Sequence, residues 1–322
     1  MRVALAGDTM LGRGVAEAMR SRPPASLVSH DVVTAAAEAD VFVLNLECCI
    51  SERGTKWPAP GKPFFFRAPP HATELLAHLG VDCVSLANNH ALDFGYDALL
   101  DTFGHLDRAG IAWVGAGPDV ARARARVMVK KLAVVAFTDH PAEFAATDTR
   151  PGVAYADLRE GVPPWARESA AGALVTPHWG PNMQAAPVPH VVRAAAELEA
   201  AGATLVAGHS AHVFQGVAGR VLYDLGDFLD DYRVDPVLRN DLGVLFLVDV
   251  GDAGPGRIEA LPLKLDFCYT RLADGEDAAW IRRRLRELCA ALGADVRKED
   301  GRIVITPRAR PVPPRDGAAP RA

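Results

Sequence analysis

The sequence predicts an α/β fold in which helices cover a central sheet. Short apolar runs of strand length alternate with alanine-rich stretches of helical length, and polar residues follow where the apolar runs end. The expected strands are Val3–Ala6, Val41–Asn45, Cys83–Ala87, Ala112–Gly115, Leu132–Phe137, Ala173–Pro177, Leu205–Ala207, Val221–Tyr223 and Val244–Val248. The expected helices lie near Gly14–Ser21, Val32–Ala39, Ala72–Leu79, Tyr96–Ala109, Pro189–Ala201 and Asp277–Leu292.

The pattern changes near residue 241, which suggests a division of the chain. Residues 1–240 form the expected core, and residues 241–306 carry strands and one long helix that we expect to pack on this core. The tail, residues 307–322, is rich in Pro, Arg and Ala and is expected to be disordered. Residues 51–70 hold five prolines and three consecutive phenylalanines, which favours a long ordered loop near a site.

Composition limits the function classes. The 322 residues are 49% hydrophobic and 23% charged, with a net charge of −5, so nothing favours binding to nucleic acid. The first residues are apolar only over a strand length, so neither a membrane anchor nor an export signal is expected, and we predict a cytoplasmic protein. The five cysteines are scattered without CxxC spacing, which argues for reduced thiols rather than disulfides.

Polar side chains follow five of the expected strands. Asp8 follows the first, Asn45 and Glu47 end the second, and His178 ends a later one. The remaining strand-end residues are Asn88, Asn89, His90, His209 and His212. Any one of these is more often a turn, capping or packing residue than a ligand. Open α/β sheets, however, place their sites beyond the carboxyl ends of strands, so we expect the side chains to converge.

The residue types at these strand ends predict a metal site. Carboxylate, amide and imidazole groups together suit hard or borderline divalent ions. We therefore expect one or two ions among Mn, Mg, Ca, Fe and Zn. The predicted ligands are Asp8, Glu47, Asn89, His178, His209 and His212.

Several strings around these residues resemble the CapA family of capsule and poly-γ-glutamate synthesis proteins. They are GDTMLGR at 7–13, NLE at 45–47, SLANNHALDFGYDALLDT at 85–102, GAG at 115–117, HWG at 178–180, GHSAHVFQG at 208–216 and YDLGDF at 223–228. The resemblance spans about residues 1–300. It implies the calcineurin-like metallophosphoesterase fold, a two-layer β-sandwich flanked by helices.

The resemblance also implies roles for individual residues. Asp8, Glu47 and His212 would surround one metal, and Glu47 would bridge to a second held by the other three predicted ligands. His90 would act as acid or base, with Asp93 orienting its ring. Asp227 is a further candidate acid. The candidate substrate-binding residues are Asn45, Asn88, Trp179 and Arg67, of which Arg67 is suggested by the aromatic, proline-rich composition of the loop 51–70 and by its ability to pair with a carboxylate.

The sequence also differs from hydrolytic relatives of that superfamily. Asp8 is followed by Thr9 and Met10 where an Asp-x-His motif is usual, and Glu47 stands where a bridging Asp is usual. No acid follows the HWG string, and Asp227 replaces a frequent Asn. These differences argue against ordinary phosphoester hydrolysis.

Three functions therefore stay open. The favoured one is an isomerase that epimerises a peptide Cα by metal-assisted proton abstraction and return, acting on a peptide or polyglutamate-type substrate. The second is a dinuclear-metal phosphoesterase. The third is a metal-stabilised, non-catalytic component of capsule or polyglutamate synthesis. The sequence does not define the oligomeric state.

Overall fold

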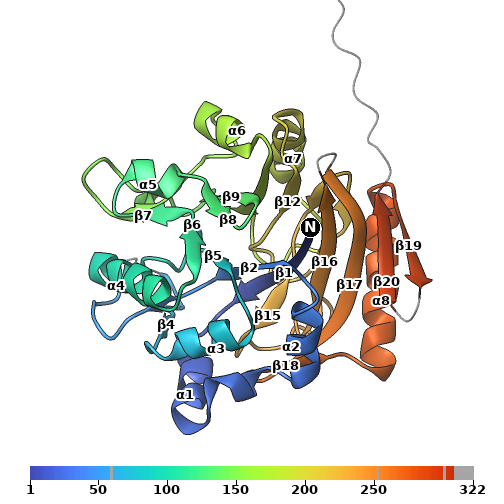
Figure 1. Cartoon of the computed structure of the whole chain (residues 1–322), viewed down its shortest axis with the longest axis horizontal. Helices are drawn as coiled ribbons and strands as arrows, with labels where there is room; N and C mark the ends of the chain where they lie inside the picture. The colour runs from blue at the N-terminus through green and yellow to red at the C-terminus, as the bar shows by residue number, and fades with distance from the viewer. Residues whose placement is uncertain (59–60, 252–253, 300–301, 308–322) are drawn as a thin grey trace, which may run out of the picture.

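The computed structural model describes residues 1–58, 61–251, 254–299 and 302–307. Its two large sheets form a sandwich, and helices lie on the outer faces (Figure 1). This arrangement confirms the predicted α/β class and the calcineurin-like sandwich. The part of residues 51–70 near Pro60 and the tail after residue 307 fall outside the described residues, so the predicted disordered tail is not assessed.

The larger sheet is mixed and has β1 at its centre. Its strands are β1 (Arg2–Thr9), β2 (Val41–Leu46), β5 (Cys83–Ser85), β6 (Ala112–Val114), β15 (Asp227–Leu229), β16 (Leu242–Gly251), β17 (Gly254–Asp266), β18 (Tyr269–Leu272), β19 (Ala294–Glu299) and β20 (Arg302–Pro307). Strands β1, β2, β5 and β6 run parallel, and β16 pairs antiparallel with β1. The carboxyl ends of the parallel strands therefore share one edge.

The second sheet is built around four parallel strands. Its members are β8 (Val127–Val129), β9 (Leu132–Thr138), β11 (Ala173–His178), β12 (Leu205–Ala207), β13 (Val217–Ala218) and β14 (Val221–Leu222). Two short pairs lie apart from it, formed by β3 (Cys49–Ile50) with β4 (Arg67–Ala68) and by β7 (Ala116–Gly117) with β10 (Gly152–Val153).

Side chains that point alternately to the two faces of each strand form the layers of the fold. In β1, Val3 and Leu5 join the apolar cluster between the two sheets, whereas Ala4 and Ala6 face the outer helices. In β9, Val134 faces the same inter-sheet cluster. Successive strand side chains point to opposite faces, so a continuous apolar run marks a strand buried on both sides.

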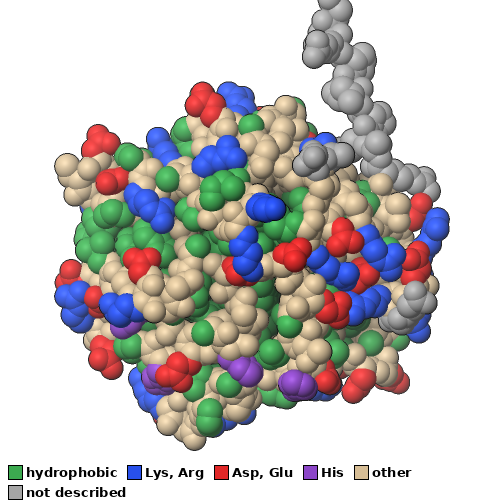
Figure 2. Space-filling view, in the orientation of Figure 1, with side chains coloured by type: hydrophobic (Ala, Val, Ile, Leu, Met, Phe, Trp, Pro, Cys, Tyr) green, Lys and Arg blue, Asp and Glu red, His purple; other side chains and the backbone are tan. Residues whose placement is uncertain are grey.

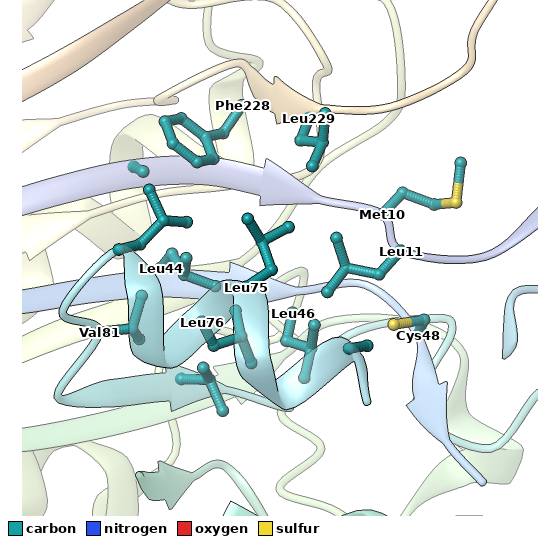
Figure 3. Close-up of a cluster of buried hydrophobic side chains, with 14 of the residues drawn as sticks. Met10, Leu11, Leu44, Leu46, Cys48, Leu75, Leu76, Val81, Phe228 and Leu229 are labelled. Carbon is teal, nitrogen blue, oxygen red and sulfur yellow. The ribbon is translucent and has the colours of Figure 1, made fainter. Parts of the chain in front are cut away.

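The outer face of the larger sheet is covered by helices α1 (Arg13–Ser21), α2 (His30–Ala36), α3 (Ala72–His78) and α4 (Gly95–Arg108). Figure 3 shows the packing, with Leu75 and Leu76 of α3 beside Leu44 and Leu46 of β2. Helix α2 begins at His30, two residues before the expected position, because the Ser29 side chain caps it by accepting a hydrogen bond from the Val32 amide.

The second sheet is covered by α6 (Pro164–Ala170) and α7 (Pro189–Ala200). Helix α7 has a proline at its first position, where the missing N–H costs nothing. The sequence prediction missed α6, α5 (Val120–Arg124) and two 3₁₀ turns, Pro24–Leu27 and Ala142–Phe144. These helical segments are seven residues or shorter, too short to show a clear helical period.

The segment after residue 240 continues the larger sheet. Strand β16 lies between β1 and β17, and α8 (Gly275–Ala291) packs its Ile281 and Leu285 into the inter-sheet cluster. The buried Glu259 of β17 pairs with the partly exposed Arg2 at 2.5 Å and Arg302 at 2.9 Å. Figure 2 shows acidic and basic side chains interspersed over this part of the molecule. No described helix is long and apolar enough to cross a membrane.

Candidate metal centre

The ends of strands from both sheets meet at one buried site. In the larger sheet Asp8 of β1 is paired in register with Asn45 of β2 on one side and with Asp227 of β15 on the other. In the second sheet His178 ends β11 and forms a bridge to His209, which follows β12. The predicted convergence of these strand-end residues is therefore present in the structure.

Asp8 lies at the centre of this group. Its Oδ1 accepts a hydrogen bond from Asn45 Nδ2 at 2.8 Å and lies 3.3 Å from His209 Nδ1. Its Oδ2 accepts from the Ser210 amide at 3.2 Å and lies 3.5 Å from His212 Nδ1. Both oxygens thus face imidazoles that belong to the opposite sheet.

Glu47 and His178 form a second part of the group. Glu47 Oε1 lies 3.3 Å from His178 Nδ1 and accepts a hydrogen bond from Asn45 Nδ2, also at 3.3 Å. Glu47 is fully buried, and its other oxygen has no hydrogen-bond partner among the described residues. A buried, unpaired carboxylate oxygen is costly unless a cation or proton compensates it.

Two ligand groups come close enough to hold an ion, Asp8 with Glu47 and His178, and Asp8 with His212 and Asp227. Three members of this cluster have buried atoms without a hydrogen-bond partner in the described chain, namely Glu47 Oε2, His209 Nδ1 and Asp227 Oδ2. The Oδ1 atom of Asn89 is likewise buried and without such a partner. Buried oxygens and nitrogens left unpaired in one cluster fit a divalent metal. Asp8, rather than the predicted Glu47, is common to both groups.

The pKa shifts of the candidate ligands agree with a bound cation at this place. Burial raises the pKa of Glu47 well above its usual range, and the neighbouring charge of Asp8 raises it further. Burial likewise raises the pKa of Asp227, with the charges of Asp230 and Asp8 adding to it. The pKa of Asp8 lies below its usual range because the hydrogen bond and charges of nearby histidines outweigh the effect of burial. The pKa of His178 is lowered, chiefly by burial, which favours the neutral ring that binds metals.

The turn after β12 carries His209 and His212, and its backbone is strained. Ser210 has φ 108° and His212 has φ 59°, both unusual for residues with a side chain. Asp224 holds this turn, because its carboxylate accepts hydrogen bonds from the amides of Ala211 at 2.8 Å and Gly226 at 2.9 Å. Such strain is typical of functional sites, where surrounding contacts maintain it.

His90 and Asp93 lie beside the centre. His90 Nδ1 is 2.7 Å from Asp93 Oδ2, as expected for a carboxylate that orients the ring. Asp93 also pairs with Lys62 Nζ at 2.5 Å and accepts a hydrogen bond from the Phe66 amide at 2.6 Å. The Phe66 ring stacks on His90 with centroids 4.0 Å apart. Burial lowers the pKa of His90.

The candidate substrate-binding asparagines are structural supports within the site. Asn88 donates to Asn45 Oδ1 at 3.0 Å and to the Leu46 carbonyl at 2.8 Å, and it accepts from the His90 amide at 3.0 Å. Asn45 itself bonds Asp8, as described above. Because both asparagines are fully buried, they fix the ligand-bearing loops and do not face a ligand cavity.

A cavity of about 670 Å³ opens on the centre. His90 and His212 line its inner wall, and its other lining residues include Arg13, Phe64, Met183 and Tyr232. The sequence prediction placed Arg67 and Trp179 in such a groove, and neither lines it. Arg67 donates to the Arg53 carbonyl at 3.2 Å and lines a separate depression, while Trp179 is 3% exposed and donates to the Tyr223 carbonyl at 2.9 Å.

Several residues of the site were missed by the sequence prediction. Thr176 lies 2.9 Å from His209 Nε2 and so helps to orient that ring. Asp224 supports the histidine turn, and Asp230 is buried close to Asp227. Tyr232 packs edge-on against His212, with ring centroids 5.2 Å apart. The string DLGDFLDDY at 224–232, with four acids in nine residues, is a signal that could have identified this segment.

Comparison with known proteins agrees with the fold. Residues 2–232 match the family model described as Bacterial capsule synthesis protein PGA_cap. The chain is a member of this capsule synthesis family, as the sequence resemblance predicted.

Its relatives cover most of the chain. A probable polyglutamine synthesis accessory protein of Mycobacterium tuberculosis is 32% identical, over 84% of this chain and 78% of the relative. The PGA biosynthesis protein CapA of Bacillus subtilis is 25% identical, over 93% and 80% respectively. The capsule biosynthesis protein CapA of Bacillus anthracis is also 25% identical, over 82% and 67%.

These relatives correct one prediction. The predicted enzyme, a peptide epimerase favoured over a phosphoester hydrolase, is wrong, because the Mycobacterium tuberculosis relatives are named accessory proteins and not enzymes. Without the epimerase reaction, no reaction remains for the acid and base roles that were assigned to His90, Asp93 and Asp227. Their positions around the candidate metal centre remain.

Proposed function

We propose that this protein is a metal-holding accessory component in the synthesis of a polyglutamate-type polymer. In this role the cavity beside the metal centre binds a segment of the polymer without changing its covalent bonds. The names of the relatives support the polymer class, since they refer to PGA biosynthesis and to polyglutamine synthesis. The cavity, at about 670 Å³, is large enough for several residues of such a chain.

One observation above all supports the metal part of this proposal. Asp8, Glu47 and Asp227 are each 1% exposed or less, and they lie within one cluster with few positive partners. Three buried carboxylates that share their positive partners with one another destabilise a protein, so their presence in one cluster favours a bound cation. The proposed ligands are Asp8, Glu47, Asn89, His178, His209, His212 and Asp227.

A divalent ion in this position would supply a fixed positive charge at the inner end of the cavity. The chain's own residues do the rest. His90 and His212 form the inner wall, and Phe64 and Tyr232 offer apolar surface to the methylene groups of a polymer. Asp93 and Phe66 hold the His90 ring in place from the side and from above.

The test uses the full-length protein and a synthetic γ-linked glutamate oligomer. Metal content is measured by elemental analysis after dialysis, and oligomer binding by isothermal titration calorimetry, with Mn²⁺ present and after chelation. We expect metal-dependent binding without any change to the recovered oligomer. Glu47→Gln and His178→Ala are expected to lose metal and binding together. Glu168→Gln is the matched control, because Glu168 is exposed on the outer helix α6.

Two results would count against the proposal. Full metal content in both Glu47→Gln and His178→Ala would remove the metal assignment. Oligomer binding that is unchanged by chelation, or the absence of any binding, would remove the polymer role. An oligomer that returns epimerised or shortened would show that the protein is a catalyst after all.

A further inference from the structure

Arg13 is the basic residue most firmly built into the wall of the cavity beside the metal centre. Its guanidinium pairs with the Asp231 carboxylate through Nη2, and its Nε donates to Asp231 Oδ1 at 3.1 Å. The Asp231 side chain is 8% exposed and also accepts a hydrogen bond from the Gly14 amide at 2.9 Å. The guanidinium is therefore held at a fixed position and angle.

Three aromatic rings enclose this guanidinium. Its central carbon lies 4.9 Å from the centroid of Phe64, 5.0 Å from that of Phe66 and 5.4 Å from that of Tyr232. Such contacts stabilise the cation and keep it from folding out into solvent. Two of these rings also contact histidines at the metal centre: Phe66 stacks on His90, and Tyr232 packs against His212.

The backbone at Arg13 is itself unusual. Its φ of 42° is in the left-handed region, which a residue with a long side chain seldom occupies. Arg13 is also the first residue of α1, directly after the loop that follows Asp8 and β1. A strained conformation that is held by an ion pair and three rings is typical of a residue whose position matters for function.

One edge of this guanidinium is open to the cavity. Its bonds to Asp231 leave from Nε and Nη2, and among the described residues no acceptor contacts Nη1. The Arg13 side chain is 29% exposed and lines the cavity with His90 and His212. An arginine that is fixed on one edge and open on the other is suited to a carboxylate or phosphate group.

We infer that Arg13 is the anion anchor of the cavity, and that it binds a free carboxylate of the polymer. This inference rests on the proposed function and adds the ligand chemistry to it. The anchor distinguishes an acidic polymer from its amidated form, because a carboxylate forms an ion pair with the guanidinium whereas an amide offers it only an uncharged acceptor. Asp231 is a positioning residue that fixes the guanidinium and does not touch the ligand.

The test compares two oligomers and several variants of the full-length, Mn²⁺-loaded protein. One probe is the γ-linked glutamate oligomer, and the other is the same oligomer with its free carboxylates amidated. We expect Arg13→Gln to weaken binding of the acidic oligomer about 10- to 100-fold, with Arg13→Lys in between. The amidated oligomer is expected to bind wild type and Arg13→Gln alike.

The control variant is Arg67→Gln. Arg67 also lies over an aromatic ring, 4.2 Å from the centroid of Phe94, but it does not line the cavity. The Arg67→Gln variant should bind both oligomers with the same affinity as the wild-type protein. Metal content and melting temperature are measured in every variant, so that loss of the fold or of the ion is not mistaken for loss of the anchor. Should Arg13→Gln fail to fold, the charge-retaining Arg13→Lys gives the comparison.

The outcomes separate the two proposals. Equal affinity of wild type, Arg13→Gln and Arg13→Lys for the acidic oligomer would overturn the anchor and leave the proposed function standing. No binding of either oligomer to the wild-type protein would remove both. Inorganic phosphate as a third probe decides the anion, because Arg13-dependent phosphate binding without oligomer binding would overturn the assignment to a carboxylate.

Discussion

Asp8 and Asp227 lie side by side in register on the parallel strands β1 and β15, and both carboxylates are buried. His212 connects them, since its Nδ1 lies 2.8 Å from Asp227 Oδ1 and 3.5 Å from Asp8 Oδ2. Two buried acids at adjacent positions repel each other, and the imidazoles of His212 and His209 compensate only part of this repulsion. The fold thus provides a place that a cation would stabilise.

The substitution Asp227→Asn should separate metal binding from stability. It removes one of the two adjacent charges, so the metal-free protein is expected to melt at a higher temperature. The same change removes a ligand or its close support, so the affinity for Mn²⁺ should fall about 10- to 100-fold. Calorimetry and metal titration measure the two effects. A metal-free variant less stable than wild type, with unchanged metal affinity, would show that no repulsion exists here.

The stability of the metal-free protein should depend on pH through Asp230. Burial raises the pKa of this carboxyl to about 6. A raised pKa in the folded state means that folding favours the protonated form, so this contribution is complete below about pH 4 and is lost as the pH rises through about 6. The loss is on the order of 3 kcal/mol. Urea unfolding between about pH 4 and pH 7 measures it. Asp230→Asn should make the profile less steep between about pH 4 and pH 6 without abolishing it, because the raised pKa values of Glu47 and Asp227 contribute a dependence of the same sign. An unaltered profile would contradict the assignment.

Asp93 is expected to contribute strongly to the stability of the folded protein beside the cavity. Its removal in Asp93→Ala leaves Lys62 and His90 without their shared carboxylate, and it frees the Phe66 amide. Breaking a buried ion pair in this way costs about 3 kcal/mol or more. Chemical denaturation measures the loss, with Asp97→Ala on the surface of α4 as the control. A variant within about 0.5 kcal/mol of wild type would contradict this role.

The predicted division at residue 240 can be tested by truncation. Strand β16 pairs with β1 from Arg2↔Asp249 to Leu5↔Phe246, so a chain that ends at 240 exposes the central strand of the larger sheet. We expect residues 1–240 alone to aggregate or to remain unfolded, because an uncovered apolar edge invites intermolecular pairing. Circular dichroism and size-exclusion chromatography measure the outcome. A folded, monomeric fragment would show that the core is independent of the later strands.

The sequence was most informative where strands are buried on both faces. Leu205–Ala207 is observed at the predicted bounds, and β11 ends at His178, one residue beyond the prediction. Polar residues that interrupt apolar runs marked the strand ends, so the metal-ligand candidates could be listed from the pattern. Which of them share an ion could not, because the register that places Asp8 beside Asp227 is a tertiary property.

The cavity wall was the least predictable part. Arg67 was favoured because it follows an aromatic run, yet Arg13, far from that run in sequence, is the arginine that Phe64 and Phe66 contact. The partner that fixes Arg13 is Asp231, more than two hundred residues away. No local pattern encodes such a pairing. The structure was also needed to show that Trp179 is buried within the second sheet's core.

The ligand set joins two layers whose shared interior is a cluster of apolar side chains. Asp8, Glu47 and Asp227 come from the larger sheet, and His178, His209 and His212 come from the second. An ion held among them would link the two sheets of the sandwich at one edge. Removal of that ion would then loosen the contact between the two sheets first at this edge. The cavity that opens there would lose its shape before the rest of the molecule unfolds.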